Sequence, residues 1–282
     1  MDTRISDLLK PPTGLNVDFS RPRGAPALTP AHGISWEVFA NPVSLFIGGV
    51  AAVLLELAEP RVRSGVWDHS SFQRDPLMRL RRTGFAAMIT VYAPHDQAEA
   101  MIANVVRMHE RVVGTTPAEH PYRANDEELL NWVQVTASFG FCEAYHQYVR
   151  PLTLEEKSRL FAEGQHPARL YGALGAPSSW QSWETLLQRT APNLEDSAIL
   201  AEFLEIIERM PLLPRPLRGI QSLLVAAAVE ITPAPVRHFA PLQRRKLGRS
   251  GLAIVRAAGA LCKAMPLPQL PARQAQRRVP KT

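Results

Sequence analysis

From Trp36 onward, apolar residues recur every three or four positions, the spacing of one face of an α-helix. Alternating runs bounded by hairpin signals are nearly absent, which argues against a substantial β-sheet. The pattern predicts helices over 74–92, 94–114, 125–149, 153–163, 178–190, 195–209, 215–229 and 248–264. We therefore expect an all-α protein with a single helical domain of about ten helices.

The three helices in the middle of the chain carry the clearest terminal signals. Asp75 is a good N-cap, and a proline follows it in the first turn. In the second helix, Asp96 and Glu99 resemble a capping box, and Gly114 supplies a C-terminal stop. The third helix starts with the acidic run 126–128, which complements the helix dipole.

Composition divides the chain into three parts. Residues 1–34 are rich in proline without a sustained period and predict an N-terminal arm, residues 35–265 form the helical domain, and 266–282 form a flexible basic tail. The net charge is +6, and much of it is local to the last forty residues. Such a tail allows weak contact with an anionic membrane surface. Aromatic residues are not interleaved with the basic ones, so no nucleic-acid partner is expected.

Several common functional signatures are missing from the sequence. No glycine-rich phosphate loop, nucleophile elbow or zinc-protease motif is present, so nucleotide and hydrolase functions have no support. The two cysteines form no disulfide framework. The longest apolar run, 43–58, is shorter than the roughly 20 residues of a membrane span, and no signal peptide precedes it. We expect a cytoplasmic protein without a transmembrane segment.

One histidine stands out among the eight. His109 lies one helical turn from Val105, Val106, Val112 and Val113, so its imidazole points to the apolar side of the second helix. A histidine in such a place is either a core residue satisfied by one hydrogen-bond partner or a ligand of a metal or haem. Periodicity alone leaves both interpretations open.

A second group of candidates lies on the preceding helix. Arg79 and Thr83 are four residues apart and therefore neighbours on one face, and Arg82 lies in the same turn. They form either a solvated basic face or a site that offers donors to an anion or to bound oxygen. Spacing does not decide between these options.

Three ordered motifs resemble the MpaB-type oxygenase superfamily, which includes the latex-clearing rubber oxygenases: GVWDHSSFQRDPLMRLRRTG, MHERVVG and YRANDEELLNWVQVT, within residues 36–240. The resemblance implies a globin-reminiscent all-α fold, b-type haem and the use of dioxygen. In that family the histidine of an H-x-x-V-x-G motif is the proximal haem ligand, here His109, followed by Val112 and Gly114. The R-x-x-x-T motif falls on Arg79 and Thr83.

The resemblance also implies which residues complete the site. Arg79 and Thr83 are expected to donate hydrogen bonds to dioxygen and to act in catalysis, while His109 holds the iron. The remaining residues expected to bind the cofactor are Arg82, Val105, Val112 and Trp132.

The chain departs from the family pattern at three points. Latex-clearing proteins carry a lysine just before the motif threonine, whereas this chain has Arg82, which stays protonated and cannot ligate iron. The sixth coordination position is therefore expected to be open to oxygen. Gln134 stands where members often have histidine after a Trp-Val pair. The sequence assigns no residue to the glutamate proposed as base in rubber cleavage.

The implied function is a haem b-dependent oxygenase that uses dioxygen on an apolar unsaturated, isoprenoid- or lipid-like substrate; oxidative cleavage of a carbon–carbon double bond and hydroxylation both stay open. One alternative is a non-catalytic haem sensor or apolar-ligand carrier. Another is a di-iron carboxylate protein, in which the pairs Glu143/His146 and Glu163/His166 supply ligands and Glu56 and Glu59 are the nearest further carboxylates.

Overall fold

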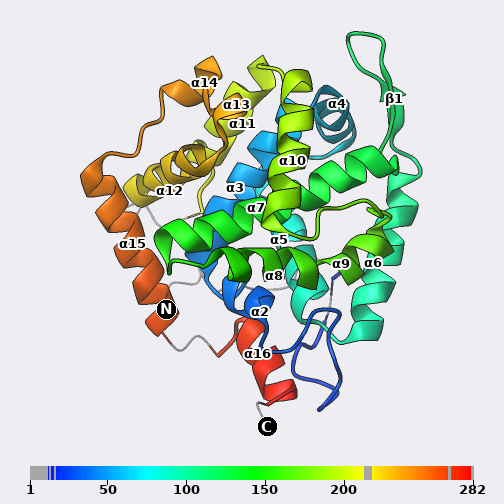
Figure 1. The fold of residues 1–282 in the computed structure, drawn as a ribbon, viewed down its shortest axis with the longest axis vertical. Helices are drawn as coiled ribbons and strands as arrows, with labels where there is room; N and C mark the ends of the chain where they lie inside the picture. The colour runs from blue at the N-terminus through cyan, green and yellow to red at the C-terminus, as the bar shows by residue number, and fades with distance from the viewer. Residues whose placement is uncertain (1–11, 13, 16, 213–217, 266–267, 281–282) are drawn as a thin grey trace.

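The computed structural model describes residues 12, 14–15, 17–212, 218–265 and 268–280. Helices dominate these residues, so the all-α prediction is confirmed (Figure 1). The helices are α2 (Ile34–Val38), α3 (Pro42–Ala58), α4 (Pro60–His69), α5 (Pro76–Tyr92), α6 (His95–His109), α7 (Glu127–Tyr148), α8 (Leu154–Glu163), α9 (Gln165–Tyr171), α10 (Trp180–Thr190), η1 (Ala191–Asn193), α11 (Ala198–Arg209), α12 (Arg218–Ile231), α13 (Ala234–Arg237), α14 (Ala240–Gln243), α15 (Arg249–Ala264) and α16 (Pro271–Arg278). A short antiparallel hairpin pairs β1 (Val113–Thr115) with β2 (Pro121–Arg123).

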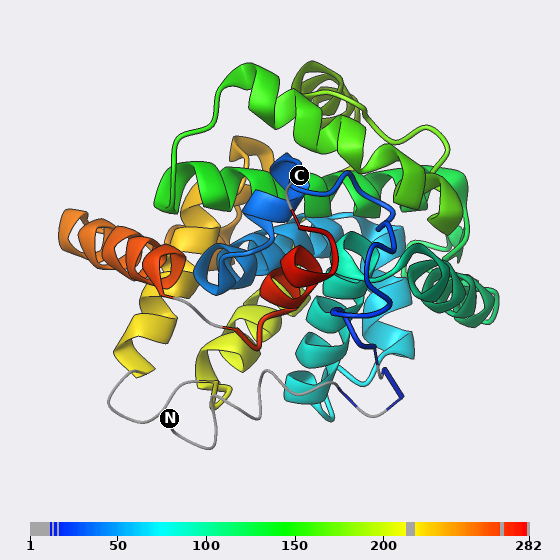
Figure 2. The same cartoon turned by 90° about the horizontal axis from the view of Figure 1, so that it is seen from below.

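Helices α3 and α7 cross at the centre of the molecule, and the other helices surround them (Figures 1 and 2). Gly48 and Gly140 lie at the crossing. A Cβ atom on Gly48 would lie 2.6 Å from the carbonyl oxygen of Gly140, and one on Gly140 would run into the carbonyl oxygen of Gly48. The two backbones therefore touch, which only glycine allows at both positions.

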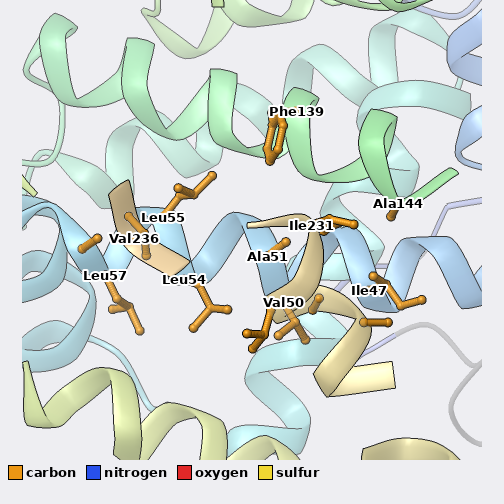
Figure 3. Close-up of a cluster of buried hydrophobic side chains, with 14 of the residues drawn as sticks. Ile47, Val50, Ala51, Leu54, Leu55, Leu57, Phe139, Ala144, Ile231 and Val236 are labelled. Carbon is orange, nitrogen blue, oxygen red and sulfur yellow. The ribbon is translucent and has the colours of Figure 1, made fainter. Parts of the chain in front are cut away.

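The main hydrophobic core surrounds α3. Buried side chains of α3, among them Ile47 and Leu54, lie in one cluster with Phe139 on α7 and Ile231 on α12 (Figure 3). A helix that is buried on most of its circumference needs apolar residues at nearly every position. Burial of α3 therefore explains the long apolar run over residues 43–58.

A second, smaller core lies beside the first. It joins the described part of the N-terminal arm to α5, α6 and α16, through buried residues that include Phe19, Trp36, Tyr92 and Ile102. Helices α5 and α6, which carry most of the predicted site residues, pack against each other here.

Helix α5 begins as the sequence predicts. The side chain of Asp75 accepts a hydrogen bond from the backbone N–H of Met78 (3.1 Å), and Pro76 is the first helical residue. The N-cap prediction is confirmed, and α7 likewise begins directly after Asp126.

Helix α6 begins within one residue of its predicted start, but the predicted capping box and the predicted C-terminal end are wrong. Pro94 is the N-cap and no side chain caps the helix, so Asp96 and Glu99 form no capping box. The helix ends at His109, because residues 113–115 pair with 121–123 as a hairpin instead of continuing the helix. Gly114 permits a close approach, since a Cβ there would lie 2.7 Å from the hydroxyl of Tyr122.

The flexible basic tail is also a wrong prediction for the part that the structure describes. Helix α16 packs against α5, with Ala272 and Ala275 buried. Arg278 is only 1% exposed. Its guanidinium donates to the carbonyl oxygens of Ala25, Phe19 and Tyr92 at 2.7–2.9 Å. A count of charges could not reveal this, because the partners are backbone carbonyls distant in sequence.

Within the described residues, no single helix combines the length and apolar composition of a membrane span. Helices α3 and α4 meet those criteria only as a pair, and the pair is bent by 110° at their junction.

Replacement of Gly48 by alanine tests the helix crossing. We expect Gly48→Ala to lower the free energy of unfolding by about 3 kcal/mol, the upper end of overpacking costs, because the obstructing atoms belong to a backbone. Gly49→Ala is the matched control: its Cβ would meet only Phe141 at 3.8 Å, so alanine should add about 0.5–1 kcal/mol of stability. Urea unfolding midpoints measure both. Equal midpoints for the two variants would contradict the crossing.

Candidate functional site

His109 occupies the last position of α6 and is half-buried. Its Nδ1 is buried and has no hydrogen-bond partner among the described residues. Burial lowers the pKa of His109, and the positive charge of Arg79 lowers it further. The imidazole is therefore neutral at physiological pH. A satisfied core histidine needs a partner that this ring lacks, whereas a neutral ring with a free nitrogen lone pair is the form that ligates metals.

The hairpin holds the end of α6 in place. The N–H of Val112 donates to the carbonyl of His109 (2.9 Å), and the N–H of Ala124 donates to the carbonyl of Val112 (2.9 Å). The side-chain amide of Asn125 donates to the carbonyl of Val106, one turn before His109 (3.1 Å). Hydrogen bonds thus hold the backbone one turn before His109 and directly after it.

Arg79 and Thr83 are in direct contact on α5. The guanidinium of Arg79 donates to the hydroxyl of Thr83, and that hydroxyl donates to the backbone carbonyl of Arg79 (3.0 Å). Burial lowers the pKa of Arg79, and the neighbouring Glu56 opposes this shift. The arginine remains a cation, since guanidinium groups do not deprotonate in proteins. The two side chains present a positive charge and a hydroxyl as one unit.

Glu56 on α3 completes the cluster. Burial raises the pKa of Glu56 to about 7, while the charge of Arg79 and the hydroxyl of Thr136 lower it. The Thr136 hydroxyl lies 3.5 Å from the Glu56 carboxylate. A carboxyl group with a pKa near 7 is half ionised at neutral pH and can both take up and release a proton.

Glu56 was not predicted to belong to this site. From the sequence it was named only, with Glu59, as one of the nearest further carboxylates of the di-iron alternative. The usable signal was a single carboxylate inside a helix that is apolar on nearly all sides. The facing residues, Arg79 and Thr136, come from other helices, so the sequence could not pair them with Glu56.

The other residues predicted to bind the cofactor are dispersed. Trp132 is buried in the main core, where its Nε1 donates to the carbonyl of Leu55 (3.2 Å) and its ring lies 6.0 Å from that of Trp183. Val112 packs against the same main core, whereas Val105 packs against the second core and Arg82 is exposed. Core packing accounts fully for Trp132.

The carboxylates and histidines of the di-iron alternative have other partners. Glu143 binds the Lys157 ammonium (2.7 Å), and Nδ1 of His146 accepts from the N–H of Leu152 (2.8 Å). Glu163 accepts hydrogen bonds from the first residues of α2. The structure does not assemble these side chains into a ligand set.

Helices α5 and α6 supply apolar side chains next in sequence to Arg79 and His109. Half-buried apolar side chains of α5 and α6 belong to the second core: Phe85, Ala86, Met88, Val105 and Val106. A haem needs apolar walls and one protein ligand, because the porphyrin supplies the other equatorial donors. His109 with its unpartnered ring nitrogen fits that requirement. A cavity of about 340 Å³ lies elsewhere, beside α2, α15 and α16, and none of the predicted site residues lines it.

Comparison with known proteins gives one match. The family model described as ER-bound oxygenase mpaB/B′/Rubber oxygenase, catalytic domain, matches residues 36–264. This span covers well over half of the chain and contains Glu56, Arg79, Thr83 and His109. No curated protein and no solved structure matches the chain.

Proposed function

The chain belongs to the family of mpaB and rubber oxygenase catalytic domains, and on that premise we propose that it is a haem b-dependent oxygenase acting on an apolar unsaturated compound of isoprenoid or lipid type. The observation that carries the proposal is the His109 ring: neutral, half-buried, with a buried nitrogen that has no partner among the described residues. Family membership supports oxygenase chemistry, and the ring supplies a place for the iron.

His109 would hold the haem, with apolar side chains of α5 and α6 along the macrocycle. When bound, the haem would supply dioxygen binding and the redox step. The protein contributes a ligand kept neutral by burial, fixed in direction by the hairpin. It also contributes an apolar surrounding that excludes water and favours an apolar substrate.

Arg79 and Thr83 are proposed to stabilise negative charge that develops on oxygen during the reaction. The hydrogen bond from the Arg79 guanidinium to the Thr83 hydroxyl holds the guanidinium in one orientation before the substrate arrives, and the Thr83 proton, donated to the Arg79 carbonyl in this structure, would turn toward the oxygen. A donor fixed as the guanidinium is incurs no reorganisation cost when charge forms, and it acts strongly where water is excluded.

Glu56 is proposed as the proton acceptor, the role for which sequence analysis found no residue. Its pKa of about 7 leaves a useful fraction of carboxylate at neutral pH. Arg79 connects it to the rest of the site, because the same charge acts on Glu56 and on His109. A non-catalytic haem sensor would give this carboxylate no role.

The iron ligand is tested by His109→Ala. Loss of the imidazole should reduce the haem content of protein from haem-replete cells to background, measured as Soret absorbance per protein. His120→Ala, which changes an exposed loop histidine, should keep full haem content. A full Soret band in the His109 variant would assign the iron to another ligand and remove the basis of the proposal.

The role of Arg79 is tested with haem still bound. Arg79→Ala should retain haem but lose at least ~10²-fold in kcat, the cost of removing one preorganised donor. Oxygen consumption with a panel of unsaturated isoprenoids and lipids measures the rate. Arg74→Ala removes an exposed arginine just before α5 and should leave the rate unchanged. Equal rates for the two variants would exclude a catalytic role for Arg79.

The protonation of Glu56 is tested by two pH profiles. In the wild-type protein, kcat should rise as pH passes about 7, because Glu56 becomes a carboxylate. Glu56→Gln should abolish this rise and lower kcat by ~10²–10⁴-fold. The group also has a pKa raised from 4.5, so the folded state keeps a proton that the unfolded state releases. The free energy of unfolding should therefore fall between pH 4.5 and about 7, and Glu56→Gln should remove that fall.

The two profiles separate the outcomes. Glu110→Gln, which changes an exposed carboxylate, should alter neither profile. If Glu56→Gln changes the stability profile but leaves the pH dependence of kcat intact, Glu56 is a buried acid and not the base.

A further inference from the structure

A cluster of three metal-ligating side chains lies at the opposite end of α6 from His109. His95 is the first residue of α6, Glu99 is one turn further, and His166 belongs to α9. One donor atom from each of the three lies within 4.8 Å of the other two, a condition that no other His, Cys, Asp or Glu triple of the described residues is found to meet. Fourteen residues separate His95 from His109, which is about 21 Å along a helix. The cluster is therefore separate from the proposed haem ligand.

The side chains already converge without a metal. Nδ1 of His95 lies 3.5 Å from Oε2 of Glu99. The rings of His95 and His166 have centroids 5.8 Å apart and are nearly parallel, with an interplanar angle of 23°. Zinc ligands at 2.0–2.1 Å in tetrahedral geometry lie about 3.3 Å from one another. Small rotations of these partly exposed side chains close the remaining gap.

The backbones that carry the three side chains are held in place. The N–H of His95 donates to the carbonyl of Pro26 (2.9 Å). Next to His166, the side-chain amide of Gln165 donates to the carbonyls of Ala176 (3.2 Å) and Pro177 (3.0 Å). Helices α6 and α9 also pack against each other. Ligands on fixed elements reduce the entropic cost of binding an ion.

We propose that His95, Glu99 and His166 form a binding site for a divalent transition-metal ion of the zinc class. Two imidazole nitrogens and one carboxylate oxygen are borderline ligands that suit such ions, and water would complete the coordination. The ion would join α9 to the start of α6. Helix α9 also contacts α5, since the hydroxyls of Tyr171 on α9 and Thr90 on α5 lie 3.0 Å apart. The ion would thus connect α9 to α6, which carries His109, and α9 in turn contacts α5, which carries Arg79.

The site is tested by zinc binding to the untagged protein as purified, after removal of loosely bound metals with a chelator. Calorimetry should show a single equivalent of Zn²⁺ bound, and about a hundredfold excess over the dissociation constant should raise Tm by roughly 5–10 °C. His166→Ala and Glu99→Gln should lose both effects, while His120→Ala keeps them. The Soret band should stay unchanged in every case, so the result is independent of the haem proposal.

A second measurement does not depend on thermal stability. Co²⁺ in place of Zn²⁺ should give visible ligand-field absorption in the wild-type and His120→Ala proteins and none in His166→Ala. Circular dichroism establishes that the variants are folded, as expected for changes at partly exposed side chains. Zinc binding and Tm shifts of equal size in wild type and His166→Ala would overturn the proposal, as would absence of binding in the wild type.

Discussion

The backbone contact between Gly48 and Gly140 is the constraint on which the rest of the structure depends. It lets the backbones of α3 and α7 touch where any side chain would clash, and so fixes their relative register. Thr136 lies one turn from Gly140 and Glu56 about two turns from Gly48, and this register brings the two side chains together. Larger residues at the crossing would separate the helices and expose the carboxylate to water, which would return its pKa toward the ordinary value.

A single positive charge organises the chemistry of the candidate site. Arg79 lowers the pKa of Glu56 against the effect of burial, and it lowers the pKa of His109 in the same direction as burial. Burial is the larger cause at both groups: it raises the pKa of Glu56 to about 7 against the charge of Arg79, and it lowers the pKa of His109 together with that charge. The guanidinium therefore favours the charged form of the acid and the uncharged form of the base.

The sequence was sufficient where the cause of a structure is local. The Asp75 cap and the acidic first turn of α7 need only neighbours along the chain, and both were predicted. Prediction from the sequence failed where a structural feature depends on residues that are not its neighbours along the chain. Gly114 ends no helix because residues 113–115 pair with 121–123 as a hairpin. Arg278 is buried because three carbonyls far away in sequence accept its protons. The motif spacings identified the region of the site, whereas the inclusion of Glu56 required the packing of α3 against its neighbours.

The same cluster carries features that cost stability. A buried imidazole nitrogen without a partner costs about 1–3 kcal/mol, and a carboxyl group buried far enough to raise its pKa to about 7 destabilises the fold whenever it ionises. A core selected for stability alone would replace either group with an apolar residue of similar size. Their occurrence together around Arg79, on helices that are otherwise well packed, is the pattern expected of groups retained for binding and chemistry. This cost, concentrated at one place, supports a functional interpretation of the cluster independently of any family motif.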